Sequence, residues 1–103
     1  MDRRLKLHEV LCTALGSRNV YFQPPASVVM QYPCIRYTLY DIDNIYADNN
    51  VYKQDVAYQI TVIDRDPDSE IVQRVSKIQG IRFNRFYTAD NLNHTVFVIY
   101  YRR

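Results

Sequence analysis

The hydrophobic pattern of residues 56–80, VAYQITVIDRDPDSEIVQRVSKIQG, changes its period once, and that change constrains the fold of the whole 103-residue chain. Apolar residues alternate from Val56 to Ile63, which predicts a β-strand with two well-filled faces. Beyond the turn at residues 64–69 the period lengthens to three or four residues, which predicts a helix with one apolar face. The residues of that face are Ile71, Val72, Val75 and Ile78.

The turn between strand and helix, Asp66-Pro67-Asp68-Ser69, has the composition of a helix start. Carboxylates accept hydrogen bonds from the unpaired N–H groups of a first turn, proline suits its first position, and negative charge favours the positive helix end. We therefore predict that Asp66 and Asp68 cap this helix. Gly80 is predicted to end it, because glycine most easily adopts a left-handed backbone conformation.

The rest of the chain supplies one more helix and four more strands. A helix is predicted over residues 2–15, with Gly16 as its stop, followed by a short extended piece over residues 20–22. Strands are predicted over residues 34–42, 81–88 and 95–101. The last strand, TVFVIYY, is apolar on both faces, so we expect helices or another subunit to cover it on both sides. The pattern predicts one α+β domain over residues 1–103, with two helices on one face of a mainly antiparallel sheet, in the order α-β-β-β-α-β-β.

Residues 41–50 break the alternating pattern with aspartate and asparagine, and the acidic stretch extends to residue 55. Four aspartates, Asp41, Asp43, Asp48 and Asp55, stand in this stretch against the single basic residue Lys53. A polar stretch of this kind between two strands predicts a long, mobile acidic loop at the tip of a protruding hairpin.

The composition favours a structural or interaction protein over a dedicated nucleic-acid or membrane protein. The formal net charge is only +2, and the basic clusters lie at the two termini. Ten tyrosines suit either strand faces or wet subunit interfaces, because tyrosine combines apolar area with a polar tip. The charged N-terminus lacks the apolar run of a secretory signal, and no apolar run approaches membrane-spanning length. We expect a protein made in the cytoplasm with no membrane contact, and two cysteines suit a reducing compartment.

No set of residues has the spacing of a catalytic or metal site. Asp64, Asp66, Asp68 and Glu70 alternate as at the start of an EF-hand loop, but Pro67 intrudes and Val75 stands where a bidentate glutamate is needed. His8, Cys12, Cys34 and His94 lack the spacing of a zinc finger. There is no G-x-S-x-G motif and no glycine-rich phosphate loop. We expect no catalytic residues, no metal and no cofactor, and a metal-dependent enzyme is the least favoured hypothesis.

Nucleic-acid binding is a second hypothesis, based on the basic and aromatic residues of 81–87, IRFNRFY. Such interleaving is typical of a platform on which single-stranded bases stack. Strict strand alternation, however, divides these residues between two faces, with Ile81, Phe83, Arg85 and Tyr87 on one and Arg82, Asn84 and Phe86 on the other. A small nucleic-acid-binding module is therefore the alternative function.

Four stretches, NVYFQPP, YPCIRY, TVIDRDPDSEI and RFYTADNLNHTVFVIYY, give the chain a family resemblance over nearly its whole length. The chain resembles the small tail completion proteins of long-tailed bacteriophages, which are also called tail terminators or head–tail joining proteins. The resemblance implies two helices against a β-sheet and a ring, typically a hexamer, that caps the tail tube. It also implies tail tube and head connector or stopper proteins as partners, the neck of the virion as the location, and no catalytic residues.

A ring through which DNA passes should not grip phosphates, so its lumen should be neutral or acidic. The resemblance and the charge of residues 41–55 together predict that the acidic loop faces the lumen or a neighbouring ring and orders on assembly, with no sequence-specific DNA contact. An ordinary solvated hairpin loop is the alternative. The predicted lumen- or partner-facing residues are Asp41, Asp43, Tyr46, Asp48, Asn50, Tyr52 and Asp55.

Overall fold

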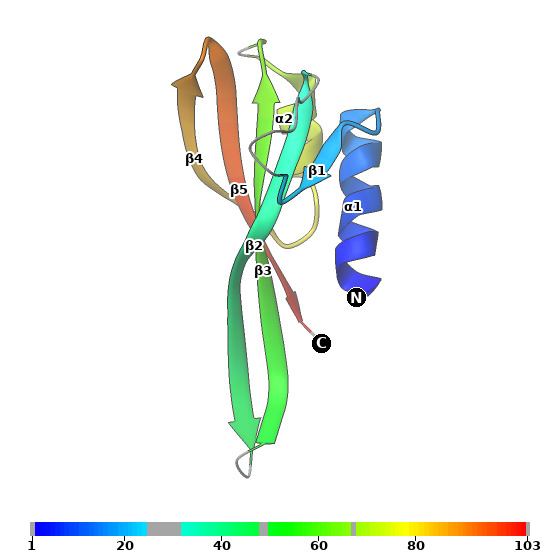
Figure 1. Ribbon diagram of the computed structural model, residues 1–103, viewed down its shortest axis with the longest axis vertical. Helices are drawn as coiled ribbons and strands as arrows, with labels where there is room; N and C mark the ends of the chain where they lie inside the picture. Colours follow the sequence, from blue (N-terminus) through cyan, green and yellow to red (C-terminus); the bar gives the residue numbers. More distant parts are fainter. Residues whose placement is uncertain (1, 25–31, 48–49, 67, 103) are drawn as a thin grey trace.

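The computed structural model describes residues 2–24, 32–47, 50–66 and 68–102, with the backbone alone described at residues 2–3, 43–47, 50–55 and 101–102. The predicted α+β class and the predicted order of elements are confirmed (Figure 1). The elements are α1 (Asp2–Leu15), β1 (Val20–Phe22), β2 (Cys34–Ala47), β3 (Asn50–Asp64), α2 (Glu70–Ser76), β4 (Ile81–Ala89) and β5 (Leu92–Arg102).

The five strands form one sheet in the order β1-β2-β3-β5-β4. Its strand pairs are antiparallel except for the short parallel pair of β1 and β2. The three central strands align Tyr37 with Ile60 and Ile60 with Phe97, so these three residues share one face. Short β1 and nine-residue β4 are the two edge strands.

Both helices pack on the face of the sheet that carries Tyr37, Ile60 and Phe97, here called the helix face (Figure 1). Leu7 and Leu11 of α1 and Val75 of α2 are fully buried against it. Burying each large aliphatic side chain stabilises the fold by about 1.5–3 kcal/mol. The apolar residues that recur every three to four positions in the helices and every second position in the strands thus pack together in a single core. The other side of the sheet, the opposite face, carries a smaller buried cluster of Cys34, Ile63 and Leu92.

The start of α2 differs from the prediction, because Ser69 is the N-cap. The Ser69 hydroxyl accepts a hydrogen bond from the Ile71 N–H at 3.2 Å and donates one to Asp64 Oδ2 at 2.6 Å. Asp66 Oδ1 accepts from the Asp68 N–H at 2.9 Å, so it shapes the turn before the helix. The predicted capping by Asp66 and Asp68 is therefore wrong. Ser69 directly precedes the first helical residue, whereas both aspartates lie at or before residue 68.

The end of α2 also differs from the prediction. The helix stops at Ser76, and the Lys77 N–H donates to the carbonyls of Arg74 and Val75 as its C-cap. Gly80 does have a left-handed φ of +86°, but it leads into β4 rather than closing the helix. At α1 the prediction is confirmed: Gly16, with φ +84°, follows Leu15 and donates its N–H to the Cys12 carbonyl at 2.9 Å.

The strands β2 and β3 continue beyond the rest of the sheet as a two-stranded ribbon, defined here as residues 41–47 and 50–55. Their pairing runs out to Ala47 and Asn50, while β5 pairs with β3 only as far as Asp55. The ribbon is the narrow lower part of Figure 1, and it gives the molecule extents of 51 × 29 × 23 Å. The predicted long loop over residues 41–55 is therefore wrong for the described residues. The pairing of β2 with β3 continues through these polar residues, and bulges near Tyr40 and Ile45 accommodate the irregular spacing.

Neither described helix is long and apolar enough to cross a membrane.

Candidate functional site

The predicted lumen- or partner-facing residues lie on the ribbon. Asp41, Asp43 and Tyr46 are on β2, and Asn50, Tyr52 and Asp55 are on β3. The register makes Asp43 the partner of Asp55 and Ala47 the partner of Asn50. Asp48 lies outside the described residues. The structure thus brings the described members of the set together on one projecting element, as strand residues rather than loop residues.

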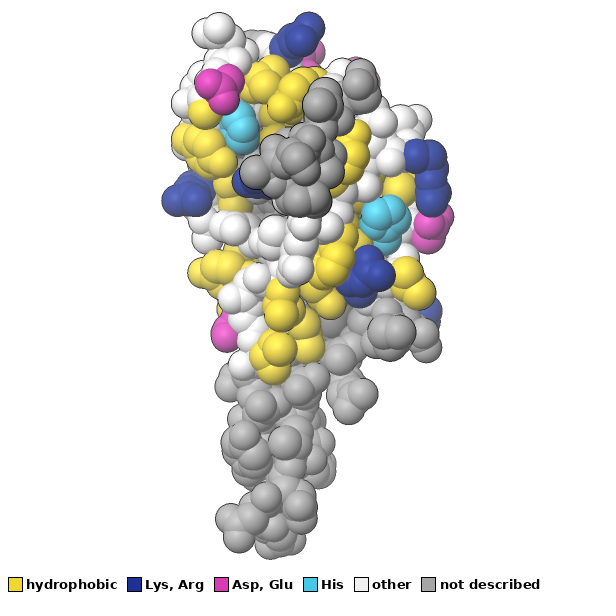
Figure 2. Space-filling view, in the orientation of Figure 1, with side chains coloured by type: hydrophobic (Ala, Val, Ile, Leu, Met, Phe, Trp, Pro, Cys, Tyr) yellow, Lys and Arg dark blue, Asp and Glu magenta, His cyan; other side chains and the backbone are white. Residues whose placement is uncertain are grey.

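Exposed apolar side chains surround the point where the ribbon joins the sheet. Leu39, Tyr40, Ile42 and Tyr100 are 44–51% exposed, and we call these four residues the collar. Figure 2 shows hydrophobic side chains gathered just above the grey ribbon. Leu39 and Ile42 pair with Tyr58 and Val56, which places them on the helix face, whereas Tyr100 pairs with Ala57 on the opposite face. The collar therefore presents apolar area on both sides of the sheet, as expected of an interaction surface.

A bulge at Asn84 changes the faces of β4 from those predicted by strict alternation. The register skips from Phe83 paired with Phe97 to Arg85 paired with Val96. As a result Phe83 and Phe86 share the helix face, while Arg82, Arg85 and Tyr87 share the opposite face. The predicted division of these residues is therefore wrong after Phe83.

Phe83 and Phe86 line a groove of about 310 Å³ between α2 and the β4–β5 hairpin. Both rings are mostly exposed, at 62% and 53%, although Phe83 also meets the Phe97 ring edge-on at 6.1 Å. The carboxylates of Asp64, Asp66 and Asp68 lie on the same groove, and among the described residues no Lys or Arg forms an ion pair with them. The groove is thus aromatic on one side and acidic on the other.

Polar contacts join α1 to the sheet and to the turn after it. The fully buried Tyr37 ring has its hydroxyl 2.8 Å from His8 Nδ1 and accepts a 3.3 Å hydrogen bond from Arg4 Nη1. The Arg4 guanidinium lies 4.5 Å from the centroid of Phe22. When His8 Nδ1 carries no proton, the Tyr37 hydroxyl donates to it while the Tyr37 oxygen accepts from Arg4. These contacts satisfy the one polar atom of a large buried aromatic side chain.

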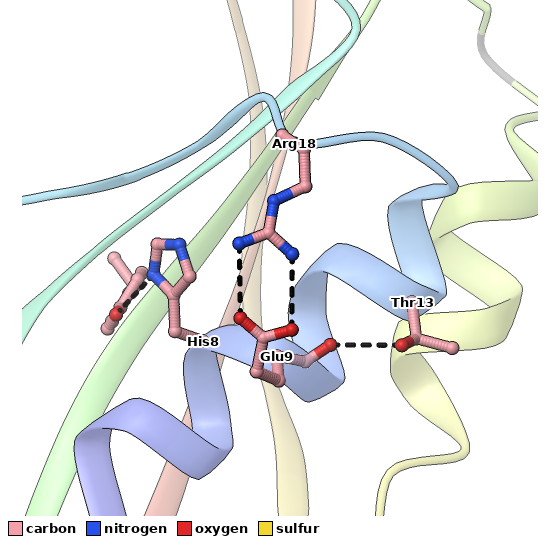
Figure 3. Close-up of polar contacts among 5 residues, drawn as sticks. His8, Glu9, Thr13 and Arg18 are labelled. Atoms are coloured by element: carbon pink, nitrogen blue, oxygen red, sulfur yellow. Dashed lines mark hydrogen bonds and ion pairs between the residues drawn. The ribbon is translucent and has the colours of Figure 1, made fainter.

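Glu9 forms the second part of this arrangement, shown with His8, Thr13 and Arg18 in Figure 3. Arg18 donates two parallel hydrogen bonds of 3.1 Å to the Glu9 carboxylate, and Thr13 donates to the Glu9 carbonyl at 3.0 Å. The ion pair is largely exposed, at 72% and 63%, so it contributes little to stability. Its pairing with Arg18 lowers the pKa of Glu9.

Burial lowers the pKa of His8, and the positive charges of Arg18 and Arg4 lower it further, while Glu9 opposes them. Burial also raises the pKa of Tyr37. A neutral imidazole beside an undissociated phenol matches the hydrogen-bond directions given above. This pair therefore joins α1 to β2.

The residues considered for zinc are dispersed. Cys12 is a buried residue of α1, and Cys34 belongs to the cluster on the opposite face. His94 stacks on Tyr87 with ring centroids 4.6 Å apart. Burial raises the pKa of the Cys34 thiol to about 11, so it is a poor nucleophile and a poor ligand at neutral pH. Within the described part of the chain, no three His, Cys, Asp or Glu residues come together as a metal site.

Sequence reasoning missed the collar and the aromatic groove. Both depend on bulges, one between Leu39 and Asp41 and one at Asn84, which shift the faces of the residues beyond them. The spacing of Phe83 and Phe86 carried a weak signal, because two phenylalanines three apart share a face only if a strand is bulged.

In comparisons with known proteins, no family model and no curated protein matches this sequence.

Proposed function

We propose that this protein is a structural subunit of a homo-oligomeric ring, typically a hexamer, that caps the tail tube of a long-tailed bacteriophage. In this role it joins the tube to the head connector, and DNA passes through the ring without sequence-specific binding. The family resemblance of the four sequence stretches suggests the phage role. The projecting ribbon with its apolar collar is the observation that carries the proposal of assembly.

The ribbon supports assembly because, among the described strands, its two strands pair only with each other beyond Asp55. A two-stranded antiparallel ribbon is marginally stable in water unless another layer or strand covers it. Beyond Asp55 the described strands of this chain offer it no further partner. A neighbouring subunit or a partner protein would supply one, and the acidic residues of the ribbon would keep it from DNA phosphates where it meets the lumen.

The collar supports the same role, because it requires a cover on each side of the sheet. Leu39 and Ile42 are about half exposed on the helix face, and Tyr100 is about half exposed on the opposite face. Aromatic and aliphatic residues of this kind form the anchors of subunit interfaces. A ring contact at the collar would bury them and would fix the base of the ribbon.

The test is negative-stain microscopy of the purified protein, with native mass measurement, alone and after mixing with phage tails that lack their end ring. We expect closed rings in solution or at the tail end. The variant Tyr100→Asp should weaken assembly by about tenfold or more, because it places a charge in the collar. A protein that forms no ring in solution and does not bind to tails would contradict the proposal.

A second candidate function, binding of single-stranded nucleic acid, is favoured by one face of β4. The Arg85 guanidinium lies 5.4 Å from the centroid of Tyr87, which stacks on His94, and Arg82 shares this face. Basic groups beside stacked rings are typical of such binding. This function predicts that the protein binds a labelled single-stranded oligonucleotide and that added salt weakens the binding. The double variant Arg82→Ala with Arg85→Ala should also weaken it. Failure to bind at about 50 mM salt would contradict it.

A further inference from the structure

Two strand edges of this chain are unpaired among the described strands, one of them in part and the other along its whole length. The outer edge of β2 is paired by β1 only from Ile35 to Tyr37, so residues 41–47 are paired on one side alone. The strand β4 pairs only with β5 and forms the end of the sheet. Unpaired edges present rows of N–H and C=O groups that can join another strand.

The two edges carry complementary residues on each face. On the opposite face the exposed Asp41 stands on β2, and the exposed Arg82 and Arg85 stand on β4. On the helix face Ile42 is 46% exposed, and Phe83 is 62% exposed. If the two edges paired, carboxylate would meet guanidinium on one face while aliphatic met aromatic on the other. Cross-strand pairs of both kinds stabilise a sheet.

We propose that β2 of one copy, at residues 41–47, adds to the β4 edge of a second copy and continues the sheet from subunit to subunit. Asp41 then lies beside Arg82 or Arg85, and Ile42 lies beside Phe83 or Phe86. This proposal rests on the proposed self-assembly, and it identifies the two surfaces that form the contact between subunits.

Charge disfavours the other pairings of the same edges. Antiparallel pairing of β4 with a second β4 about the Phe83–Asn84 bond would align Arg82 with Arg85, and like charges opposite one another are destabilising. The β3 strand of the ribbon carries the basic residue Lys53, whose charge does not complement the arginines of β4. The edge of β2 is therefore the one whose charge complements the arginines of β4.

The proposed contact is heterologous, because it joins two different surfaces. Each subunit therefore offers β2 to one neighbour and β4 to another. Repeated contacts of this type close into a ring or extend as a filament, whereas a contact between two identical surfaces stops at the dimer. This difference gives a direct test.

The test is disulfide cross-linking of the double variant Asp41→Cys with Arg85→Cys, and of Asp41→Cys with Arg82→Cys, at up to about 1 mM protein. We expect at least one double variant to give a ladder of dimers, trimers and larger species on a non-reducing gel. The single-cysteine variants should give no ladder. The native Cys12 and Cys34 are buried, and burial raises the pKa of both thiols, so they should not contribute.

A charge exchange gives the second measurement. Arg85→Asp alone and Asp41→Arg alone should each weaken self-association by about tenfold, and combining them should restore it. Lys77→Asp, which makes the same charge change at an exposed residue beyond α2, is the matched control and should leave association unchanged.

The possible outcomes distinguish the β2–β4 contact from the proposed role in ring assembly. Rings without a ladder, or a double charge exchange that fails to restore association, would overturn the β2–β4 contact while leaving ring assembly intact. Ladders stopping at the dimer would overturn it as well. A protein that stays monomeric at every concentration and does not bind tails would overturn both proposals.

Discussion

The helix-covered part of the sheet and the ribbon are formed by the same two strands, yet their surroundings are opposite. Between Cys34 and Tyr37, and between Val56 and Ile63, β2 and β3 carry largely buried residues, and two helices cover one of their faces. Beyond Ile42 the same strands pair only with each other, apart from the end of β5 at Asp55. The difference indicates that the stability of the folded chain resides in the first part, whereas the second part is where we propose that assembly takes place.

The largest effect on stability is expected in the core under α1. Leu11→Ala removes a fully buried side chain and should lower the free energy of unfolding by about 2–5 kcal/mol. Chemical denaturation monitored by circular dichroism measures it. The control is Leu5→Ala on the same helix, where the side chain is 51% exposed and the loss should stay below about 1 kcal/mol. Equal losses at the two sites would contradict the packing described for α1.

The cap of α2 should contribute the next largest effect. Ser69→Ala removes the acceptor for the Ile71 N–H and the donor to Asp64, and should lower the free energy of unfolding by about 1–2 kcal/mol. Asp68→Ala is the matched control, because the Asp68 side chain is exposed and does not cap the helix. A larger loss of stability in the Asp68 variant than in the Ser69 variant would contradict the cap at Ser69 and support the cap predicted from the sequence.

Acid should weaken the contact between α1 and the sheet. Because burial lowers the His8 pKa in the folded protein, the unfolded chain binds a proton at this residue more readily. The stability that neutral His8 contributes is fully present above its ordinary pKa of 6.5 and is lost as the pH falls through the lowered folded value. The charges of Arg18 and Arg4 act to lower the His8 pKa further, and the charge of Glu9 acts to raise it.

The measurement is the difference in unfolding free energy between the wild type and His8→Gln from pH 8 to pH 5. The wild type should lose more stability than the variant toward pH 5. A wild type that gains stability relative to the variant toward pH 5 would contradict the lowered pKa.

The sequence predicted most of the helix-covered part, since the periods of α1, β3 and α2 are set by burial on one face. It did not predict the ribbon as strand, because the Asp- and Asn-rich composition of residues 41–55 is equally typical of a loop. The fold of those residues follows from the pairing of β2 with β3, and pairing partners leave little trace in local composition. For the same reason the faces of Phe86 and Arg85 could not be predicted, because the bulge at Asn84 has no distinct signal.

The smallest effect on stability, and the most direct test of the division between fold and assembly, is expected from removing most of the ribbon. Replacing residues 44–54 by Asn-Gly joins Asp43 to Asp55, its partner in the ladder, through a two-residue turn that suits a hairpin. The free energy of unfolding should change by less than about 1 kcal/mol, because the described core cluster is built from residues 7–37 and 56–99. Self-association, measured by sedimentation, should be lost. An assembly that persists without the ribbon, or a shortened chain that fails to fold, would contradict the account.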